Sequence, residues 1–193
     1  MNQPELAVES GLPSVLALAR ERWVETARLD LGELARELGI GRATIFRWVG
    51  SRDALMGEVI WSFHEPELHR ALQQSGNRGA ALMADLCRES MESVLCFEPM
   101  RQWAHRDSEY ALKILSSETG VIHGRAVAFA LQVLRREMAD GHIAPVLALD
   151  ELARLLVRIE TSFLFSDLAC GREPSVDSAC KAVEILVAAR GCQ

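Results

Sequence analysis

The break at Gly39-Ile40-Gly41 constrains the fold of this chain more than any other feature of its sequence. Within the stretch LARELGIGRATIFRW (residues 34–48), one helical pattern ends at Gly39 and a second begins three residues later. A glycine directly after a helix adopts the left-handed conformation that ends it, so we expect a full stop there. Two helices joined by such a short turn cross at a steep angle, and the second can protrude. A helix that is packed in a core does not need this break, whereas a helix that is exposed for binding to a partner needs it.

Helical signals continue along the whole chain, and strand signals are nearly absent. Runs of β-branched residues are few, and no Asn-Gly or Asp-Gly hairpin turn occurs. Asp30 and Ser51 stand where N-caps are expected, and Pro66 should kink or restart the helix that follows Ser51. The pattern predicts an all-α protein of about nine helices. The later ones are expected from Asn77, from Pro99 to Ser116, from Thr119 to Asp140, and over 149–170 and 176–190.

The lengths of the predicted helices divide the chain into two parts. The first three helices are short and the six that follow are longer, so we place a boundary near Arg52. The chain has 193 residues, of which 49% are apolar, and this is enough for a substantial core. We therefore expect a helix-turn-helix head over residues 1–52 and a larger helical domain over residues 53–193.

The third helix of the head has the length and the side chains to read DNA. A protruding helix of about two turns fits the major groove, with its N-terminal side chains at the base edges. Arginine can bind guanine through two hydrogen bonds, and threonine can contact the methyl group of thymine. The candidate base-reading residues are Arg42, Ala43 and Thr44, and the candidate phosphate-binding residues are Arg47, Trp48 and Arg52.

The charge of the chain limits where nucleic acid could bind. The net charge is −6, so a surface that binds nucleic acid everywhere is excluded and only a local patch is possible. Residues 36–53 hold four arginines and two acidic residues, which makes this segment locally basic. On spacing alone, an ordinary helical corner with solvated arginines explains the segment about as well as a DNA-reading helix.

The segment LDLGELARELGIGRATIFRWVGSRDALMGEVI (residues 29–60) resembles the DNA-binding domain of the tetracycline-repressor (TetR) family. The resemblance covers about 45 residues, from 14 to 60. It rests on four matching motifs: Leu34-Ala35, Gly39-Ile40-Gly41, Thr44-Ile45-Phe46 and Arg52-Asp53-Ala54-Leu55. It implies a homodimeric transcription regulator, usually a repressor, that binds a palindromic double-stranded operator. Its larger domain would bind a small effector molecule and form the dimer.

Three residues depart from the family pattern. Phe46 replaces the usual tyrosine, so a hydrogen bond from a hydroxyl to phosphate is lost, although we still expect Phe46 at the DNA surface. Val49 stands where phenylalanine is commoner and should still fill the core of the head. Arg52 replaces lysine and keeps its charge. None of these changes removes the role of the third helix in reading DNA.

The larger domain contains polar residues within apolar helical patterns. Taken singly, each of them is more simply a core residue or part of a solvated face, but the resemblance implies that some of them line an effector cavity. The candidates are Trp103, His105, Tyr110, His123, Arg125 and Ser162. An apolar cavity with few donors suits an amphipathic molecule with an acyl tail and a lactone or carboxyl head. The segment RIETSFLFSDLACGREPSVDSAC (residues 158–180) is also similar to the subgroup that controls quorum-signal lactone degradation (QsdR).

The last two predicted helices carry more apolar surface than a monomer needs. Core packing accounts for part of it, and the remainder suits a four-helix interface with two helices from each subunit. The residues expected there are Leu152, Leu155, Ile159, Phe163, Val183, Leu186 and Val187.

Other classes of function find little support. The stretch HEPELH (residues 64–69) places two histidines five residues apart around a proline, whereas a zinc-protease helix needs them four apart. No nucleophile elbow, phosphate loop or dinucleotide motif occurs, so we expect no enzyme, metal or cofactor. The five cysteines show no pairing pattern in the sequence. We also find no signal segment and no run of about 18 apolar residues. These features favour a cytoplasmic protein without a membrane span. Two alternatives remain open: a head that binds another protein, and an enzyme built on a helical bundle.

Overall fold

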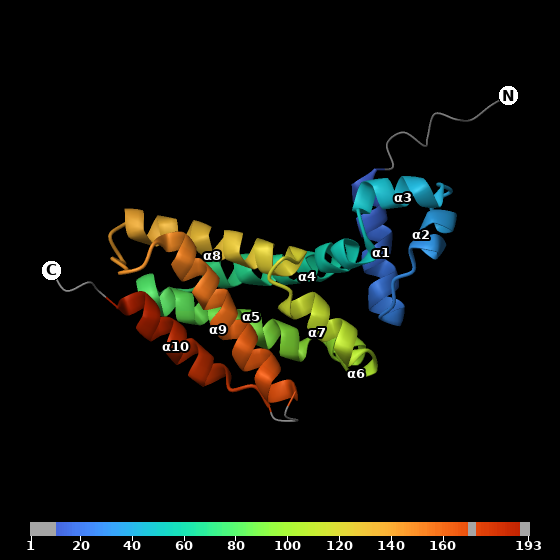
Figure 1. Ribbon diagram of the computed structural model, residues 1–193. Helices are drawn as coiled ribbons and strands as arrows, with labels where there is room; N and C mark the ends of the chain where they lie inside the picture. Colours follow the sequence, from blue (N-terminus) through green and yellow to red (C-terminus); the bar gives the residue numbers. More distant parts are fainter. Residues whose placement is uncertain (1–10, 170–172, 190–193) are drawn as a thin grey trace.

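The computed structural model describes residues 11–169 and 173–189, and these residues form ten α-helices and no strand (Figure 1). The all-α fold is therefore confirmed. Among the described helices, none combines the length and the apolar character that a membrane crossing requires. The helices are α1 (Leu12–Thr26), α2 (Leu31–Glu37), α3 (Arg42–Val49), α4 (Arg52–Gln74), α5 (Gly79–Cys96), α6 (Glu98–Arg106), α7 (Ser108–Ser116), α8 (Val121–Ala139), α9 (Leu149–Ala169) and α10 (Val176–Ala188).

The helix ends in the head follow the signals in the sequence. Gly39 adopts a positive φ of 66°, and the amide of Ile40 donates to the carbonyl of Ala35, which ends α2 as expected. The Asp30 carboxylate accepts hydrogen bonds from the amides of Gly32 and Glu33, and the Ser51 hydroxyl accepts one from the amide of Ala54. The predicted stop and both predicted N-caps are confirmed.

The predicted helix over residues 99–116 is two helices, so the described residues form ten helices where about nine were expected. The break is at Asp107, whose backbone (φ −138°, ψ 61°) is not helical. No glycine or proline marks this position. Contacts with the head accompany the break: Arg106 donates to the carbonyl oxygens of Thr26 and Ala27, and Lys113 binds the Asp53 carboxylate.

Two further helix signals were wrong or incomplete. Pro66 does not restart a helix, because α4 continues through it. Proline cannot donate to the carbonyl of Ser62 four residues earlier, and the Arg20 guanidinium donates to this carbonyl instead, over 3.3 Å. Asn77 is not an N-cap either, since α5 begins at Gly79 and the Asn77 amide group donates to Asp85.

The buried apolar side chains of the described residues form two cores. Figure 1 shows α1, α2 and α3 gathered at one end of α4. The first core, which we call the head core, joins α1–α3 to the first half of α4 and to α6 and α7. The second, the body core, joins α5, α8, α9 and α10. The helix α4 runs from one to the other. The head core therefore extends past the boundary that was expected near Arg52.

Candidate functional site

The outward face of α3 is the candidate surface for DNA. Ile45 and Val49, one turn apart, are buried in the head core, and Val49 fills that core as expected. This anchoring turns the remaining side chains of α3 away from the core. Arg42, Ala43, Phe46 and Arg47 are exposed, while Thr44 and Trp48 are partly buried. Phe46 is 42% exposed.

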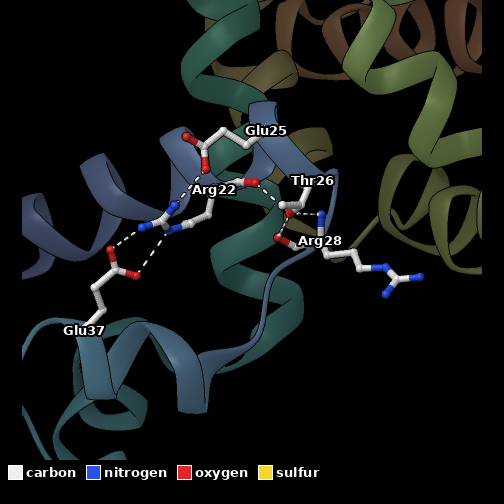
Figure 2. A network of polar contacts seen from close by, with 5 residues as sticks. All are labelled: Arg22, Glu25, Thr26, Arg28 and Glu37. Atoms are coloured by element: carbon white, nitrogen blue, oxygen red, sulfur yellow. Dashed lines mark hydrogen bonds and ion pairs between the residues drawn. The ribbon is translucent and has the colours of Figure 1, made fainter.

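A network of charged residues joins α1 to α2 behind this surface. Figure 2 shows the Arg22 guanidinium with two nitrogens on the Glu37 carboxylate and a third on Glu25, 2.7 Å away. The Thr26 hydroxyl accepts from the amide of Arg28 as the chain leaves α1 (Figure 2). The hydrogen bonds from Arg22 lower the pKa of Glu37. All these groups are exposed, so their ion pairs contribute little to the stability of the protein. We infer that they orient α2 against α1.

The side chains of Arg42 and Arg52 lie against other parts of the protein, whereas the sequence pattern suggested that they point toward DNA. The Arg42 guanidinium lies beside Gly32, such that a Cβ built on that glycine would be 3.7 Å from its Cζ. Arg52 Nε donates to the carbonyl of Leu29 over 3.1 Å, and its guanidinium lies 4.6 Å from the ring centre of Tyr110. Arg52 thus connects the head to α7 as well as standing at the start of α4.

A cavity of about 450 Å³ opens between α4, α5 and α6, and we call it the α4–α5 cavity. Its wall is mostly apolar and its polar residues are mostly acidic. It is lined by Ile60, Phe63, His64, Glu67, Glu89, Glu92, Ser93, Val94, Cys96, Phe97 and Met100. A smaller cavity of about 50 Å³ shares the His64 side chain and extends toward α8, α9 and α10.

A chain of hydrogen bonds runs from the lining of the larger cavity to that of the smaller one, through the shared side chain of His64. His64 Nδ1 lies 2.9 Å from the Ser93 hydroxyl, and His64 Nε2 lies 3.0 Å from the Ser90 hydroxyl. The Ser90 hydroxyl donates in turn to the carboxylate of Glu160. Four side chains from α4, α5 and α9 are therefore connected inside the domain.

The surroundings of this chain shift the pKa of both titratable ends. Burial lowers the pKa of His64 to about 4, so its ring is neutral near pH 7. Burial raises the pKa of Glu160 to about 7, against a smaller opposing effect of the hydrogen bond from Ser90. Both side chains keep a little accessible surface, and both line the cavities, so we take this surface to face the interior. A carboxyl group with such a pKa inside a cavity is a candidate binding group.

The C-terminal part of the chain matches a known protein family. Residues 78–188, more than half of the chain, match the model described as the tetracyclin repressor-like C-terminal domain. The chain belongs to the TetR family. Its predicted resemblance to that family is confirmed, and it is a transcriptional regulator, since TetR-family regulators are non-enzymatic DNA-binding proteins.

Solved structures of two repressors resemble this TetR-family chain. The R. erythropolis transcriptional repressor QsdR, from the TetR family, is 26% identical and has a TM-score of 0.85, with 99% of each chain covered. This match supports the predicted similarity to the QsdR subgroup. NalD, the secondary repressor of the MexAB-OprM multidrug efflux pump in Pseudomonas aeruginosa, is 18% identical with a TM-score of 0.46, and 89% and 90% of the two chains are covered. No curated protein sequence matches the chain.

The ligand-binding residues expected from the sequence of this TetR-family protein do not converge on one cavity. Trp103 is buried in the head core, and the Tyr110 hydroxyl donates to Asp53 over 2.9 Å. His105 lines a separate cavity of about 800 Å³ between α5, α6, α7 and α9. Arg125 pairs with Glu58. The last two lie apart from these: His123 is partly exposed near Glu118, and Ser162 is exposed on α9.

The sequence reasoning missed His64, Ser90 and Glu160. His64 belongs to the HEPELH stretch, which was considered only as a metal site and set aside. Ser90 and Glu160 each interrupt an apolar helical face, but so do many solvated residues. The nearest pair is separated by 26 positions in the chain, so no local pattern announces that they meet.

The residues expected at the dimer interface fall into two groups. Leu152, Val183 and Val187 are buried in the body core of their own protomer, so they offer no surface to a partner. Leu155, Ile159, Phe163 and Leu186 remain partly exposed. Ile185, which was not predicted, is 60% exposed on α10.

Within the described part of the chain, one group of side chains at the end of α8 has the residue types that could hold a metal ion. Ligand atoms of Glu137, Asp140 and His142 lie within 4.8 Å of one another. However, the buried Glu137 carboxylate already accepts from the amide of Gly79 over 2.7 Å and lies 3.0 Å from His142 Nδ1. These bonds connect the start of α5 to the end of α8, which explains the group as a structural contact.

Proposed function

We propose that this TetR-family regulator is a cytoplasmic repressor that binds a palindromic operator as a homodimer. A small amphipathic molecule in the larger domain would release the DNA. The observation that carries the proposal is the outward face of α3. Ile45 and Val49 hold the helix in the head core, and this leaves Arg42, Ala43 and Arg47 exposed on one protruding element. Such a helix has the size and the donors for the major groove.

The cavities support the second half of the proposal. The α4–α5 cavity has a volume of about 450 Å³, within the range of small-molecule sites. Its apolar wall suits an acyl or alkyl tail, as expected from the sequence. The helix α4 lines this cavity and also begins at the head, so a molecule that binds there touches the element that positions α3. It would release DNA only if it binds the DNA-incompetent form more tightly than the competent form.

A selection of random duplexes tests the DNA half of the proposal. The region upstream of the protein's own gene should be included, and we expect enrichment of a palindrome whose half-sites are about one helical turn apart. Binding should weaken as salt rises, because phosphate contacts release counterions. A head that binds protein, which the exposed Phe46 would also suit, predicts no enriched sequence and no salt-dependent shift of duplex DNA.

Two arginine variants separate base reading from phosphate binding. We expect Arg42→Ala to cost about 1–3 kcal/mol and to relax the base preference at one operator position. Its guanidinium must leave Gly32 to do so, which a long exposed side chain can do. Arg52→Ala should weaken binding to all duplexes and reduce the salt dependence, and the loss of its bond to Leu29 should add to this. An unchanged base preference in Arg42→Ala would show that α3 is oriented differently.

A third pair of substitutions tests the dimer. Leu155→Glu combined with Ile159→Glu would place unpaired charges on partly exposed apolar positions of α9. We expect sedimentation to show a monomer that no longer shifts operator DNA. Val24→Glu, at an exposed apolar position of α1, should leave the dimer intact. A dimer that persists in the double variant would place the interface elsewhere.

A further inference from the structure

The described residues that line the two cavities meeting at His64 include carboxylates but no lysine or arginine. Glu67, Glu89 and Glu92 line the larger cavity, and Glu160 lines the smaller one. Glu67 pairs with Arg70, and Glu92 lies 3.6 Å from Arg88, but both arginines stand outside the cavity walls. His64, the one basic side chain in the walls, is neutral near pH 7.

Among the residues that the structure describes, no positive charge faces Glu160, the carboxylate that lines the smaller cavity. Its hydrogen-bond partner within this part of the chain is the neutral hydroxyl of Ser90, beyond which lies His64 of α4. The thiols of Cys87 on α5 and Cys180 on α10 are the other titratable groups near it, and both are protonated because burial raises their pKa. The α8 side chains in this wall are apolar: Ala126, Phe129 and Ala130.

The larger cavity also offers aromatic rings. Phe63 and Phe97 both line it, with their ring centres 5.2 Å apart. From outside the cavity, the Arg20 guanidinium lies 4.4 Å from the ring centre of Phe63. Aromatic faces attract cations through their quadrupole, and the combination of such rings with carboxylates is a recognised environment for ammonium groups.

We propose that the effector is a cationic amphiphile, whose protonated amine pairs with Glu160 and whose apolar tail fills the α4–α5 cavity. This inference rests on the proposed function and names the class of its effector. A volume of about 50 Å³ beside Glu160 admits a head no larger than an ammonium group, because one water occupies about 30 Å³ in the liquid. The cavity of about 450 Å³ then remains for the tail.

The charge of the walls distinguishes between the possible heads. A buried charge is costly unless it is paired, so an amine and Glu160 each remove the cost of burying the other. A carboxylate head, one of those considered from the sequence, would meet four glutamates and no cation. A lactone or an alcohol can accept or donate hydrogen bonds but cannot neutralise Glu160. The preference should therefore run from amine to neutral compound to carboxylate.

Calorimetry with three probes of equal chain length tests this order. Octylamine, 1-octanol and octanoate would be titrated against the full-length protein at pH 7.5. We expect octylamine to bind at least tenfold more tightly than octanoate. Glu160→Gln should weaken the binding of octylamine at least tenfold and leave that of octanol within about twofold. Glu151→Gln, which removes an exposed carboxylate from the same helix, should change neither. Equal affinities for octylamine and octanoate, or no effect of Glu160→Gln, would overturn the proposal.

The pH dependence of octylamine affinity tests the ion pair, because a purely structural role of Glu160 would leave this dependence unchanged. The amine stays protonated from pH 6 to pH 8, while Glu160 ionises because its pKa is about 7. The affinity for octylamine should therefore rise about tenfold over this interval, with a proton released on binding. In Glu160→Gln the affinity should be flat. A flat profile in the unaltered protein would also contradict the proposed ion pair.

Octylamine binding and operator binding are measured separately, so that either one can fail without the other. Octylamine binding is measured without DNA, and operator binding is measured without octylamine. A protein that binds octylamine through Glu160 but no operator would leave the cationic site standing and remove the repressor. A protein that binds its operator but prefers octanoate or octanol would leave the repressor standing and remove the cationic site.

Discussion

The head and the larger domain of this TetR-family regulator differ in how their functional residues are brought together. In the head, the exposed residues of α3 lie within one short helix, and the signals that shape it stand between positions 30 and 51: Asp30, Gly39 and Ser51. In the larger domain, the hydrogen-bonded chain of His64, Ser90 and Glu160 joins three helices through residues that are 26 and 70 positions apart in sequence. An exposed helix face can therefore be set by the local sequence, whereas a cavity is made by tertiary packing.

The cores differ in the same way. The head core is closed around Trp23, whose ring lies 5.8 Å from those of Phe63 and Phe97 and 6.1 Å from that of Trp103. The body core borders the smaller cavity and contains polar groups near it, including Ser90 and Glu160. A closed core fixes the orientation of α3. A core with space and a buried carboxyl group can respond to a bound molecule.

The largest expected effect tests whether the head core and the larger domain unfold as one unit. Trp23→Ala removes a fully buried ring that contacts α4 and α6, and we expect a loss of about 3–5 kcal/mol of unfolding free energy. The indole N–H has no hydrogen-bond partner among the described residues, so the change strands no acceptor. Val24→Ala, at the exposed neighbouring position, should cost less than about 0.5 kcal/mol.

Denaturant unfolding of Trp23→Ala, followed by circular dichroism, also shows how sharply the two regions divide. A single transition at lower denaturant would mean that the head core holds both parts together. Two separate transitions would show that the head unfolds alone, and the extension of its core into α4, α6 and α7 would then have little energetic weight.

The next effect belongs to the larger domain and depends on pH. The pKa of Glu160 is raised to about 7 in the folded protein, above the ordinary value of 4.5 for a glutamate. Between these values the folded state keeps a proton that the unfolded state has lost, so the contribution of Glu160 to stability is present below pH 4.5 and declines as the pH rises to 7. Relative to the unaltered protein, Glu160→Gln should be equally stable near pH 4 and more stable near pH 7.5, by up to about 3 kcal/mol.

His64 changes its protonation in the same pH range, so the effect of Glu160 on stability is found by comparing Glu160→Gln with the unaltered protein. Its pKa is lowered to about 4 from 6.5, so the unfolded state binds the extra proton between these values and stability rises with pH there. The two groups oppose each other in the unaltered protein and should nearly cancel. Thermal melts across pH 4 to 8 would show a flat profile for the unaltered protein and a rising one for Glu160→Gln. Parallel profiles would mean that Glu160 is solvated and that the two regions do not differ in this respect.

The limits of prediction from sequence follow from the same difference. The fold class, the family, the N-caps at Asp30 and Ser51 and the stop at Gly39 could be predicted because each depends on neighbours in the chain. The break at Asp107 could not, since no local signal marks it and contacts with the head accompany it. The cavity residues could not either, because Glu160 looks like any other polar residue on α9 until α4 and α5 are placed against it.

The smallest expected effect concerns the N-cap of α2. The Asp30 carboxylate accepts from the amides of Gly32 at 2.6 Å and Glu33 at 3.0 Å, and these bonds lower its pKa. Asp30→Ala leaves both amides without that acceptor and should cost about 1 kcal/mol. Because the folded pKa lies below the unfolded one, the contribution of the charge is present above the unfolded pKa and is lost as the pH falls through the folded value.

Asp30→Asn sharpens this last test, because its side-chain oxygen keeps the cap without the charge. We expect Asp30→Asn to lose only a few tenths of a kcal/mol at pH 7 in denaturant titrations, and to match the unaltered protein at a pH where Asp30 is protonated. Operator affinity should follow the same order, since α2 supports the turn that places α3. If Asp30→Ala lost operator binding without any loss of stability, Asp30 would contact DNA directly, and the head surface would extend beyond α3.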